Sequence, residues 1–515
     1  MPDYESSLKK IAKGAGIAII GVFFSKLFSY LFRFIGARYG ANEYGLFTLS
    51  LTLAAFMVVI CTLGLEKGLL RYIPQFLEEN KPNKIKGIIK TAISYSLILS
   101  LIITIPLIIF TPWIHQTFFK NITSPHFQII LRIILLTIPL HTILRIFTYS
   151  FRAFNKNEYE VYTRSLVEGG LKFILGLLIF FLGYSIISLS AIYSISILIA
   201  FIVGLFYLKK SFPDLTSKLK PEYFSKELLK YSLPLISTGI FITLIASIDT
   251  FMLAYFKNEY AVGIYNTVVP IGQLMYIVPF AILTLFIPVM TRLYTNNKKQ
   301  EFKQLYKTIS KWIAKSSLLI LILIYLYPKE LLGLMFGPEY VVGSTALIIL
   351  ATGYFLNFLV FSSESILMVL KKTKLILYNS IIISIINIIL NYFLIKVHGI
   401  EGAATATAIS FIIWGIVLFS ESYYLTKIIP FKLSLVKILI SGLITLIIFV
   451  FINTTTLSKL IFLLYMILTS SLYIILLLIT KSFDKEDVLI IKYFQEKTKI
   501  KIPLLNKILI KFIER

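Results

Sequence analysis

The sequence is poor in cysteine, in acidic residues and in long polar segments. One cysteine, Cys61, occurs in 515 residues, which excludes a disulfide framework and any metal site built on several cysteines. The four histidines have no metal-ligand spacing, and no Walker A motif is present, so we expect no catalytic residues, no metal site and no ATP site. The only small-molecule cofactor left open is a coupling Na⁺ or H⁺.

Apolar stretches of bilayer length fill most of the chain instead. Hydrophobic residues make up 57% of the sequence and the mean hydropathy is +0.86. Because a spanning helix needs about 20 mainly apolar residues, we predict an all-α integral membrane protein with about 14 transmembrane helices. The predicted helices are 14–38, 44–70, 87–111, 128–152, 160–182, 186–208, 228–256, 261–292, 303–327, 341–369, 375–396, 402–426, 433–452 and 458–480.

The net charge is +26, and the positive residues lie mainly in short loops and at the C-terminus. This distribution is typical of a protein that is oriented in a membrane by its loop charges, rather than of one that binds nucleic acid. Every second loop is rich in lysine and arginine, and the loops between them carry one cation or none. This alternation predicts that the protein lies in the cytoplasmic membrane with both termini in the cytoplasm. The N-terminus has no cleavable-signal pattern, so the first helix is expected to stay as a span. The sequons at Asn121 and Asn453 fall in loops predicted to be external.

An internal repeat divides the chain. Asn42-Glu43-Tyr44 recurs as Asn258-Glu259-Tyr260, an offset of 216 residues that also relates Gly183 to Gly399. Each copy holds an even number of helices, so we predict two pseudo-symmetric six-helix lobes related by an axis along the membrane normal. The predicted divisions are 1–210, 211–426, two extra helices in 427–481, and a basic amphipathic cytoplasmic tail in 482–515, for which a solvated, frayed tail is the alternative.

Ionisable residues inside predicted spans are expensive to insert and therefore mark functional positions. Lys26, Arg33, Arg145 and Lys172 are predicted to bind a phosphate group, because arginine in particular donates paired hydrogen bonds to phosphate. For Lys172, an i,i+4 pair with Glu168 is an equally good explanation. Two further cations, Arg132 and Arg164, lie near helix ends, where snorkelling explains them better.

Uncharged polar residues supply a second, weaker set of candidates. Tyr30, Asn266 and Gln273 are predicted to contact sugar hydroxyls, with helix–helix hydrogen bonding as the alternative. Two intramembrane acids, Asp249 and Glu364, are predicted to act in gating or in ion coupling. The repeat offset relates Arg33 to Asp249, so Asp249 could also serve as a counter-charge to Arg33.

Two segments resemble a known group of transporters: Asn42-Glu43-Tyr44-Gly45-Leu46-Phe47, and Gly399-Ile400-Glu401-Gly402-Ala403-Ala404-Thr405-Ala406-Thr407. The chain is similar to the polysaccharide flippases of the multidrug/oligosaccharidyl-lipid/polysaccharide exporter superfamily. This resemblance implies two lobes around a central cavity, alternating access, and a lipid-linked sugar phosphate as cargo. In such proteins the cavity is lined with basic side chains, and Lys26, Arg33 and Arg145 correspond to them by location only.

The predicted function is therefore translocation of a polyprenyl- or dolichyl-linked oligosaccharide for the assembly of surface polysaccharide or glycoprotein. We do not expect the protein to be an enzyme. Its expected partners are the lipid-linked oligosaccharide, membrane lipids and glycan-assembly enzymes, but no nucleic acid, and the expected state is a monomer. A cation-coupled multidrug exporter of the same superfamily is the first alternative, and a membrane glycan polymerase or ligase is the second.

Overall fold

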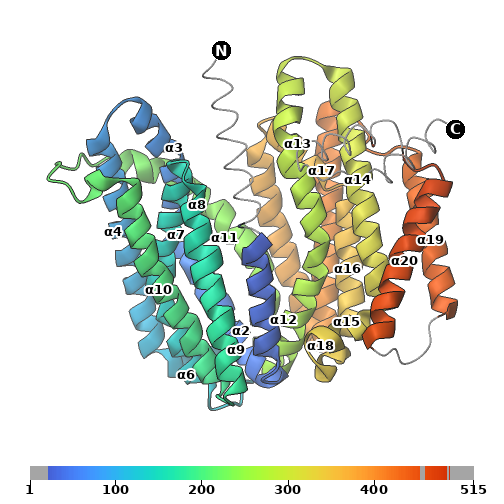
Figure 1. Cartoon of the computed structure of the whole chain (residues 1–515), viewed down its shortest axis with the longest axis horizontal. Coiled ribbons are helices and arrows are strands. Elements are labelled where there is room, and N and C mark those ends of the chain that lie inside the picture. Colours follow the sequence, from blue (N-terminus) through green and yellow to red (C-terminus); the bar gives the residue numbers. More distant parts are fainter. Residues whose placement is uncertain (1–20, 22, 453–458, 484–486, 488–515) are drawn as a thin grey trace. The chain divides into compact units, whose positions relative to one another are not determined.

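The computed structural model describes residues 21, 23–452, 459–483 and 487. All regular secondary structure in these residues is helical (Figure 1). Eleven helices in this part of the chain are long and apolar enough to cross a membrane. The chain divides into two compact units, Met1–Asn266 and Thr267–Arg515, and within each unit the long helices run side by side as a bundle. The prediction of an all-α membrane protein is confirmed.

The first helix that the structure describes in unit 1 covers residues 23–37. The elements that follow are α2 (Ala41–Cys61), α3 (Leu65–Glu78), α4 (Pro82–Ile109), α5 (Thr111–Phe118), α6 (Phe127–Leu135), α7 (Thr137–Ala153), α8 (Asn157–Glu160), the π-helix η1 (Val161–Gly169), α9 (Gly170–Phe181), α10 (Ile186–Ser211), η2 (Pro213–Leu215) and α11 (Ser225–Phe256). The next helix, α12 (Glu259–Gln273), crosses the division between the units.

Unit 2 continues from the last turns of α12. Its elements are η3 (Leu274–Tyr276), α13 (Ile277–Thr295), α14 (Lys299–Leu326), α15 (Pro328–Met335), η4 (Pro338–Gly343), α16 (Ser344–Phe358), α17 (Ser362–Val369), α18 (Thr373–Thr426), α19 (Ser434–Ile452) and α20 (Lys459–Ile479). The sequon at Asn453 and all of the predicted tail except residues 482, 483 and 487 lie outside the described residues.

The division between the units falls at 266/267, later than the predicted lobe boundary at 210/211. The reason is packing: α11 lies along α2 and α3, so this helix, which opens the second sequence repeat, belongs with unit 1. Asn266, one of the predicted sugar ligands, is consequently the last residue of unit 1, whereas Gln273 lies in unit 2.

Several predicted helices are interrupted where the backbone changes conformation. The helix predicted over 44–70 is wrong in its second half: Gly64 adopts a left-handed conformation (φ 69°) and a new amphipathic helix, α3, begins after it. Lys67 and Arg71 lie on this new helix. Breaks also divide the predicted helices 261–292 and 341–369, at η3 and between α16 and α17.

Helix α18 is two antiparallel legs rather than one rod. Gly399 has φ 55° and ψ −120°, outside the helical region, and the chain reverses there. Buried amides join the legs: Asn387 Nδ2 donates to Thr407 Oγ1 at 3.3 Å and to Ser410 Oγ at 3.2 Å. The separate helices predicted over 375–396 and 402–426 correspond to these legs.

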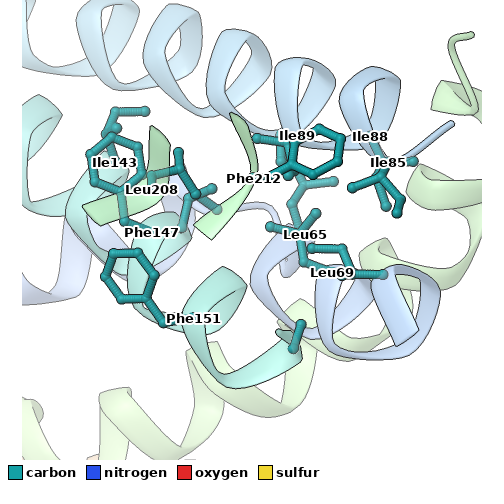
Figure 2. Close-up of a cluster of buried hydrophobic side chains, with 14 of the residues drawn as sticks. Leu65, Leu69, Ile85, Ile88, Ile89, Ile143, Phe147, Phe151, Leu208 and Phe212 are labelled. Carbon is teal, nitrogen blue, oxygen red and sulfur yellow. The ribbon is translucent and has the colours of Figure 1, made fainter. Parts of the chain in front are cut away.

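A compact apolar cluster holds the ends of several unit 1 helices together (Figure 2). Its members come from α3, α4, α7, α10 and α11, together with Phe212 directly after α10, and Leu65, Leu69, Ile88 and Phe151 are fully buried. Packing of these helices matters because α3 and α7 carry two charged residues of the site described below.

Two glycines bring α2 and the start of α12 into backbone contact. A Cβ on Gly45 would lie 1.9 Å from the carbonyl oxygen of Glu259, and a Cβ on Gly263 would lie 1.9 Å from that of Ala41. No side chain fits at these distances, so glycine is required at both positions. The contact joins the two copies of the repeated Asn-Glu-Tyr segment, and both copies belong to unit 1.

Candidate functional site: a cationic network in unit 1

Arg145 on α7 is ion-paired with an acid that the sequence reading did not single out. Its Nη2 lies 3.2 Å from Oε1 of Glu66, in the first turn of α3. The Glu66 side chain is 3% exposed, whereas that of Arg145 is 28% exposed. The pair therefore presents its guanidinium outward and its carboxylate inward, and the arginine keeps surface that a ligand can reach.

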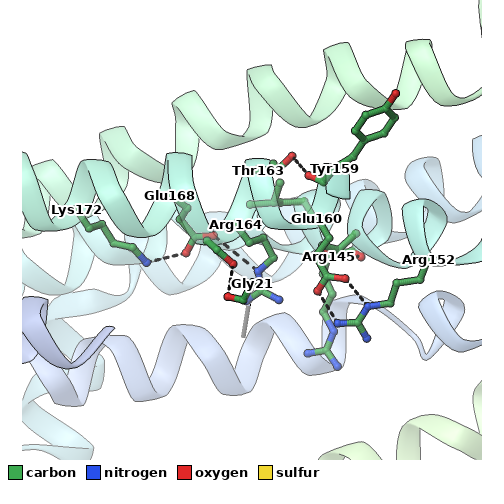
Figure 3. Close-up of polar contacts among 12 residues, drawn as sticks. Gly21, Arg145, Arg152, Tyr159, Glu160, Thr163, Arg164, Glu168 and Lys172 are labelled. Atoms are coloured by element: carbon green, nitrogen blue, oxygen red, sulfur yellow. Dashed lines mark hydrogen bonds and ion pairs between the residues drawn. The ribbon is translucent and has the colours of Figure 1, made fainter. Parts of the chain in front are cut away.

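Glu168 sits between two cations at the end of the π-helix (Figure 3). Its carboxylate lies 2.7 Å from Lys172 Nζ and 3.8 Å from Arg164 Nε, one helical turn on either side. The alternative given for Lys172, an i,i+4 pair with Glu168, is what the structure shows. Arg164 also does more than snorkel, because it shares the same carboxylate.

The π-helix of residues 161–169 fixes where these charges point. π-Segments are rare and often occur at functional sites. Ser165, within this segment, donates to the backbone carbonyl of Gly21 at 2.8 Å, so the first helix packs against it (Figure 3). The same segment thus carries Arg164 and Glu168 and positions the helix that bears Arg33.

Two residues on neighbouring helices complete the network, and sequence reasoning missed both. His141 on α7 interacts electrostatically with Glu168, Arg164, Lys172 and Arg145. The ring of Tyr193 on α10 lies under the Lys172 ammonium, 4.8 Å from Nζ to the ring centroid. The spacing of the histidines in the sequence gives no sign of this role, because the neighbours of His141 come from other helices.

Arg33 on the first helix is partly exposed and makes no ion pair with a carboxylate of the described residues. It acts electrostatically on three tyrosines, Tyr30, Tyr44 and Tyr193. Lys26, on the same helix, is exposed. The predicted cationic face of this helix is therefore accessible.

Positive charge exceeds negative charge across this network. Four cations, Arg33, Arg145, Arg164 and Lys172, meet two carboxylates, Glu66 and Glu168, which leaves an excess of two positive charges. Unpaired charge within membrane-spanning helices is costly, and a bound anion would remove that cost. An anion such as a phosphate has the charge, and the oxygen acceptors for guanidinium donors, that would complement this network.

The other predicted ligands make contacts of their own. Asn266 Nδ2 donates to Thr250 Oγ1 at 3.2 Å and to the Val262 carbonyl at 2.9 Å, so the helix–helix alternative describes it. Asp249 is 5% exposed and accepts a hydrogen bond from Tyr265. In unit 2, Gln273 is exposed, and Glu364 on α17 faces Tyr276.

The family of this chain follows from comparison with known proteins. Residues 11–294 match the family model described as polysaccharide biosynthesis protein, and residues 234–393 match the MatE family model. The first match covers more than half of the chain. The chain belongs to the polysaccharide biosynthesis protein family. The predicted resemblance to polysaccharide flippases of the exporter superfamily is confirmed.

Two curated relatives are informative for this family member. An uncharacterized membrane protein of Methanocaldococcus jannaschii is 24% identical over 473 residues, which covers 86% of this chain and 90% of the relative. A probable low-salt glycan biosynthesis flippase of Haloferax volcanii is 27% identical over 221 residues, covering 42% of this chain and 46% of the relative. The second match therefore concerns less than half of either protein.

Solved structures show the same fold. A lipid II flippase, MurJ, in an inward closed conformation superposes with a TM-score of 0.73 at 19% identity, covering 90% of this chain and 98% of that one. An inward-facing multidrug resistance transporter of the MATE family gives a TM-score of 0.69 at 14% identity, covering 80% and 98%. Because the sequence identities are below 20%, these comparisons show that the chain shares the fold of these transporters, and they show nothing further.

Proposed function

We propose that this polysaccharide biosynthesis family protein is a flippase that moves a lipid-linked oligosaccharide across the membrane. The observation that carries the proposal is the excess of positive charge in unit 1, where two cations remain after every carboxylate of the network is counted. A phosphate or pyrophosphate joins sugar to lipid in such cargo, and it is the anion that this network suits. The family match and the flippase relative support the same cargo class.

The proposed roles follow from accessibility. Arg33 and Lys26 bind the phosphate first, because both reach the surface of unit 1. Arg145 joins through its exposed guanidinium edge while Glu66 holds its position. Lys172 acts mainly through its charge, since Glu168 and Tyr193 already occupy its ammonium. Tyr30, the exposed Gln273 and Asn266 are the proposed sugar contacts. Asn266 also has a structural role, because its side chain joins α11 and α12.

Transport of a fluorescent polyprenyl-pyrophosphate oligosaccharide into proteoliposomes tests this function. Arg33→Gln should lower the initial rate about tenfold or more, since a charge-assisted hydrogen bond contributes about 1.5–3 kcal/mol. Arg33→Lys should restore part of the rate by keeping the charge. Arg132→Gln is the matched control, because Arg132 on α6 is exposed and lies outside the network. Equal rates for Arg33→Gln and Arg132→Gln would remove the site assignment, and no transport by the unaltered protein would remove the function.

A cation-coupled multidrug exporter is the second candidate, favoured by the MatE match over residues 234–393 and by the MATE-family structures. It predicts that a cationic dye binds and is released by protons or sodium through Asp249 or Glu364. Dye binding that survives Asp249→Asn and Glu364→Gln unchanged would count against this candidate.

The remaining parts of the proposal concern context. We propose that both termini lie in the cytoplasm, that the protein works as a monomer without catalysing a bond change, and that Asp249 or Glu364 couples Na⁺ or H⁺ to transport. Membrane lipids and glycan-assembly enzymes are the proposed partners. Cysteine labelling from either side of the membrane, with single cysteines introduced at exposed positions such as Lys120 and Ser217, tests the orientation directly.

A further inference from the structure

Two arginines of α7 are held by carboxylates through hydrogen bonds. Arg152 uses two nitrogens: Nε donates to Glu160 Oε2 at 2.6 Å, and Nη2 donates to Oε1 of the same residue (Figure 3). Arg145 uses one nitrogen, which donates to Glu66 Oε1 at 3.2 Å. Because a guanidinium carries five N–H donors in a planar fork, Glu160 occupies one edge of the Arg152 fork, whereas most donors of Arg145 stay open.

Arg164 is engaged less than either of these arginines. Its Nε lies 3.8 Å from Oε2 of Glu168, which is close enough for an ion pair but too far for a hydrogen bond (Figure 3). Its guanidinium makes no hydrogen bond within the residues that the structure describes. The side chain is also 40% exposed. All of its N–H donors are therefore open to a ligand.

The π-helix explains why Glu168 bonds Lys172 rather than Arg164. Arg164 and Glu168 both lie in the π-segment of residues 161–169. Backbone hydrogen bonds in a π-helix join residues five apart, so side chains four apart align less well than they do on an α-helix. Lys172 lies in the regular helix α9, and its Nζ reaches Glu168 Oε1 at 2.7 Å. The wider turn thus keeps an arginine near a carboxylate without joining the two.

Arg164 lies among the other cations of the network. It acts electrostatically on His141, as Arg145 does, and on Tyr193, as Arg33 does. An anion bound by the network is therefore within range of its charge. Arg164 is also one of the four cations that give the network its excess of two positive charges, so that replacing it by a neutral residue leaves an excess of one.

We propose that Arg164 is the residue through which the network selects phosphoryl groups by charge. Its fork donates paired hydrogen bonds to phosphoryl oxygens. A ligand with two or more negative charges removes the whole excess of positive charge, whereas a ligand with one leaves part of it, and unbalanced charge within spans is costly. This inference rests on the proposed function and adds a residue to it, because the phosphate contacts proposed above do not include Arg164.

Two soluble probes test the selection on the full-length protein in detergent: inorganic pyrophosphate, and dimethyl phosphate, which carries a single charge. Isothermal titration calorimetry measures both affinities. Arg164→Gln should weaken pyrophosphate binding about tenfold or more, since it removes charge-assisted hydrogen bonds of about 1.5–3 kcal/mol. It should weaken dimethyl phosphate binding about fivefold or less, as expected for an exposed charge that makes no hydrogen bond to the probe. Arg164→Lys keeps the charge without the fork and should give an intermediate ratio of affinities.

The double variant Arg152→Gln/Glu160→Gln is the matched control. It removes an arginine and a carboxylate that already occupy each other, so the net charge stays the same and both affinities should stay as in the unaltered protein. Thermal unfolding shows whether each variant is folded. An equal loss of affinity for both probes in Arg164→Gln overturns the proposal, because it would show attraction without selection. No loss for either probe, or no binding by the unaltered protein, overturns it as well.

Competition with a polyprenyl pyrophosphate separates the two sources of such a ligand. Displacement of inorganic pyrophosphate by the polyprenyl compound supports selection of lipid-linked cargo, whereas no displacement assigns Arg164 to a soluble anion and overturns its role in cargo selection. The outcome for the proposed function is distinguishable. Charge selection through Arg164 in a protein that transports no lipid-linked oligosaccharide overturns that function alone. Transport together with unchanged selection in Arg164→Gln overturns this inference alone.

Discussion

The carboxylate of Glu66 lies 3.2 Å from the guanidinium of Arg145, and it holds an arginine of α7 against the first turn of α3. The contact spans 79 residues of sequence. Glu66 follows directly on the turn at Gly64, whose left-handed backbone lets α3 begin there. The next residue, Lys67, donates to the Leu235 carbonyl at 3.1 Å and so ties α3 to α11. One short turn thus orients a cation of the proposed phosphate site.

This pair predicts strong coupling between its members. Glu66→Gln and Arg145→Gln should each lower the free energy of unfolding by about 1–3 kcal/mol, because the first leaves the partly exposed guanidinium and the second leaves the buried carboxylate without this ion pair. The double variant should cost less than the sum of the two, since no charge is then left alone. Thermal unfolding in detergent measures all three. Strict additivity would show that the two groups do not interact in the folded protein.

Glu168 should matter more for stability than Lys172. Glu168→Gln leaves Lys172 and Arg164 facing each other without a carboxylate, and it should cost about 3 kcal/mol. Lys172→Gln leaves Glu168 with Arg164 and should cost about 1 kcal/mol. The order of the two melting temperatures checks this prediction, and a less stable Lys172→Gln would mean that the lysine, not the acid, organises the cluster.

Adding a methyl group at the contact between α2 and α12 should destabilise the protein. Gly45→Ala places a Cβ 1.9 Å from the Glu259 carbonyl oxygen, so the helices must separate, at a cost of at least about 1–3 kcal/mol. Gly170→Ala is the matched control, because nothing lies within 4 Å of its Cβ and alanine favours helix. Yield of folded protein and melting temperature compare the two. A Gly45→Ala protein as stable as Gly170→Ala contradicts the close crossing.

In unit 2, Asp487 should anchor the chain beyond α20. Its carboxylate accepts hydrogen bonds from Lys311 Nζ at 2.9 Å, Lys315 Nζ at 3.2 Å and Trp312 Nε1 at 2.7 Å, all on α14. Asp487→Asn removes the negative charge that two buried ammonium groups contact and should destabilise unit 2 by about 3–5 kcal/mol.

Glu301→Gln is the control for Asp487→Asn, because the Lys298–Glu301 pair is exposed and such pairs contribute about 0–1 kcal/mol. Melting temperature and the rate of trypsin cleavage after residue 481 are the two readouts. Similar values for both variants would show that the carboxylate contributes no more than a surface charge.

Helix positions could be predicted from the sequence to within a few residues wherever an apolar run ended in charged residues. The predicted 186–208 and 433–452 correspond to α10 and α19. Predictions failed where a helix changed direction without losing hydrophobicity. Gly64 breaks the helix predicted over 44–70, and η3 divides that predicted over 261–292, because backbone conformation rather than burial determines those breaks.

For the site, the sequence identified the cations but not what surrounds them. Arg33, Arg145 and Lys172 stand out in any reading, since charge within an apolar run is rare. The i,i+4 pair of Lys172 with Glu168 could also be foreseen from spacing. The contact of Arg145 with Glu66 could not, because the two residues are distant in sequence and meet only when α3 packs on α7.

The sequence alone determined that the protein is a helical membrane protein with an excess of intramembrane positive charge, because span length and charge are local properties of the chain. Only the tertiary structure decided which cations are neutralised and that Asn266 joins α11 and α12. Those outcomes depend on distances between residues far apart in the chain, and packing of the helices sets these distances.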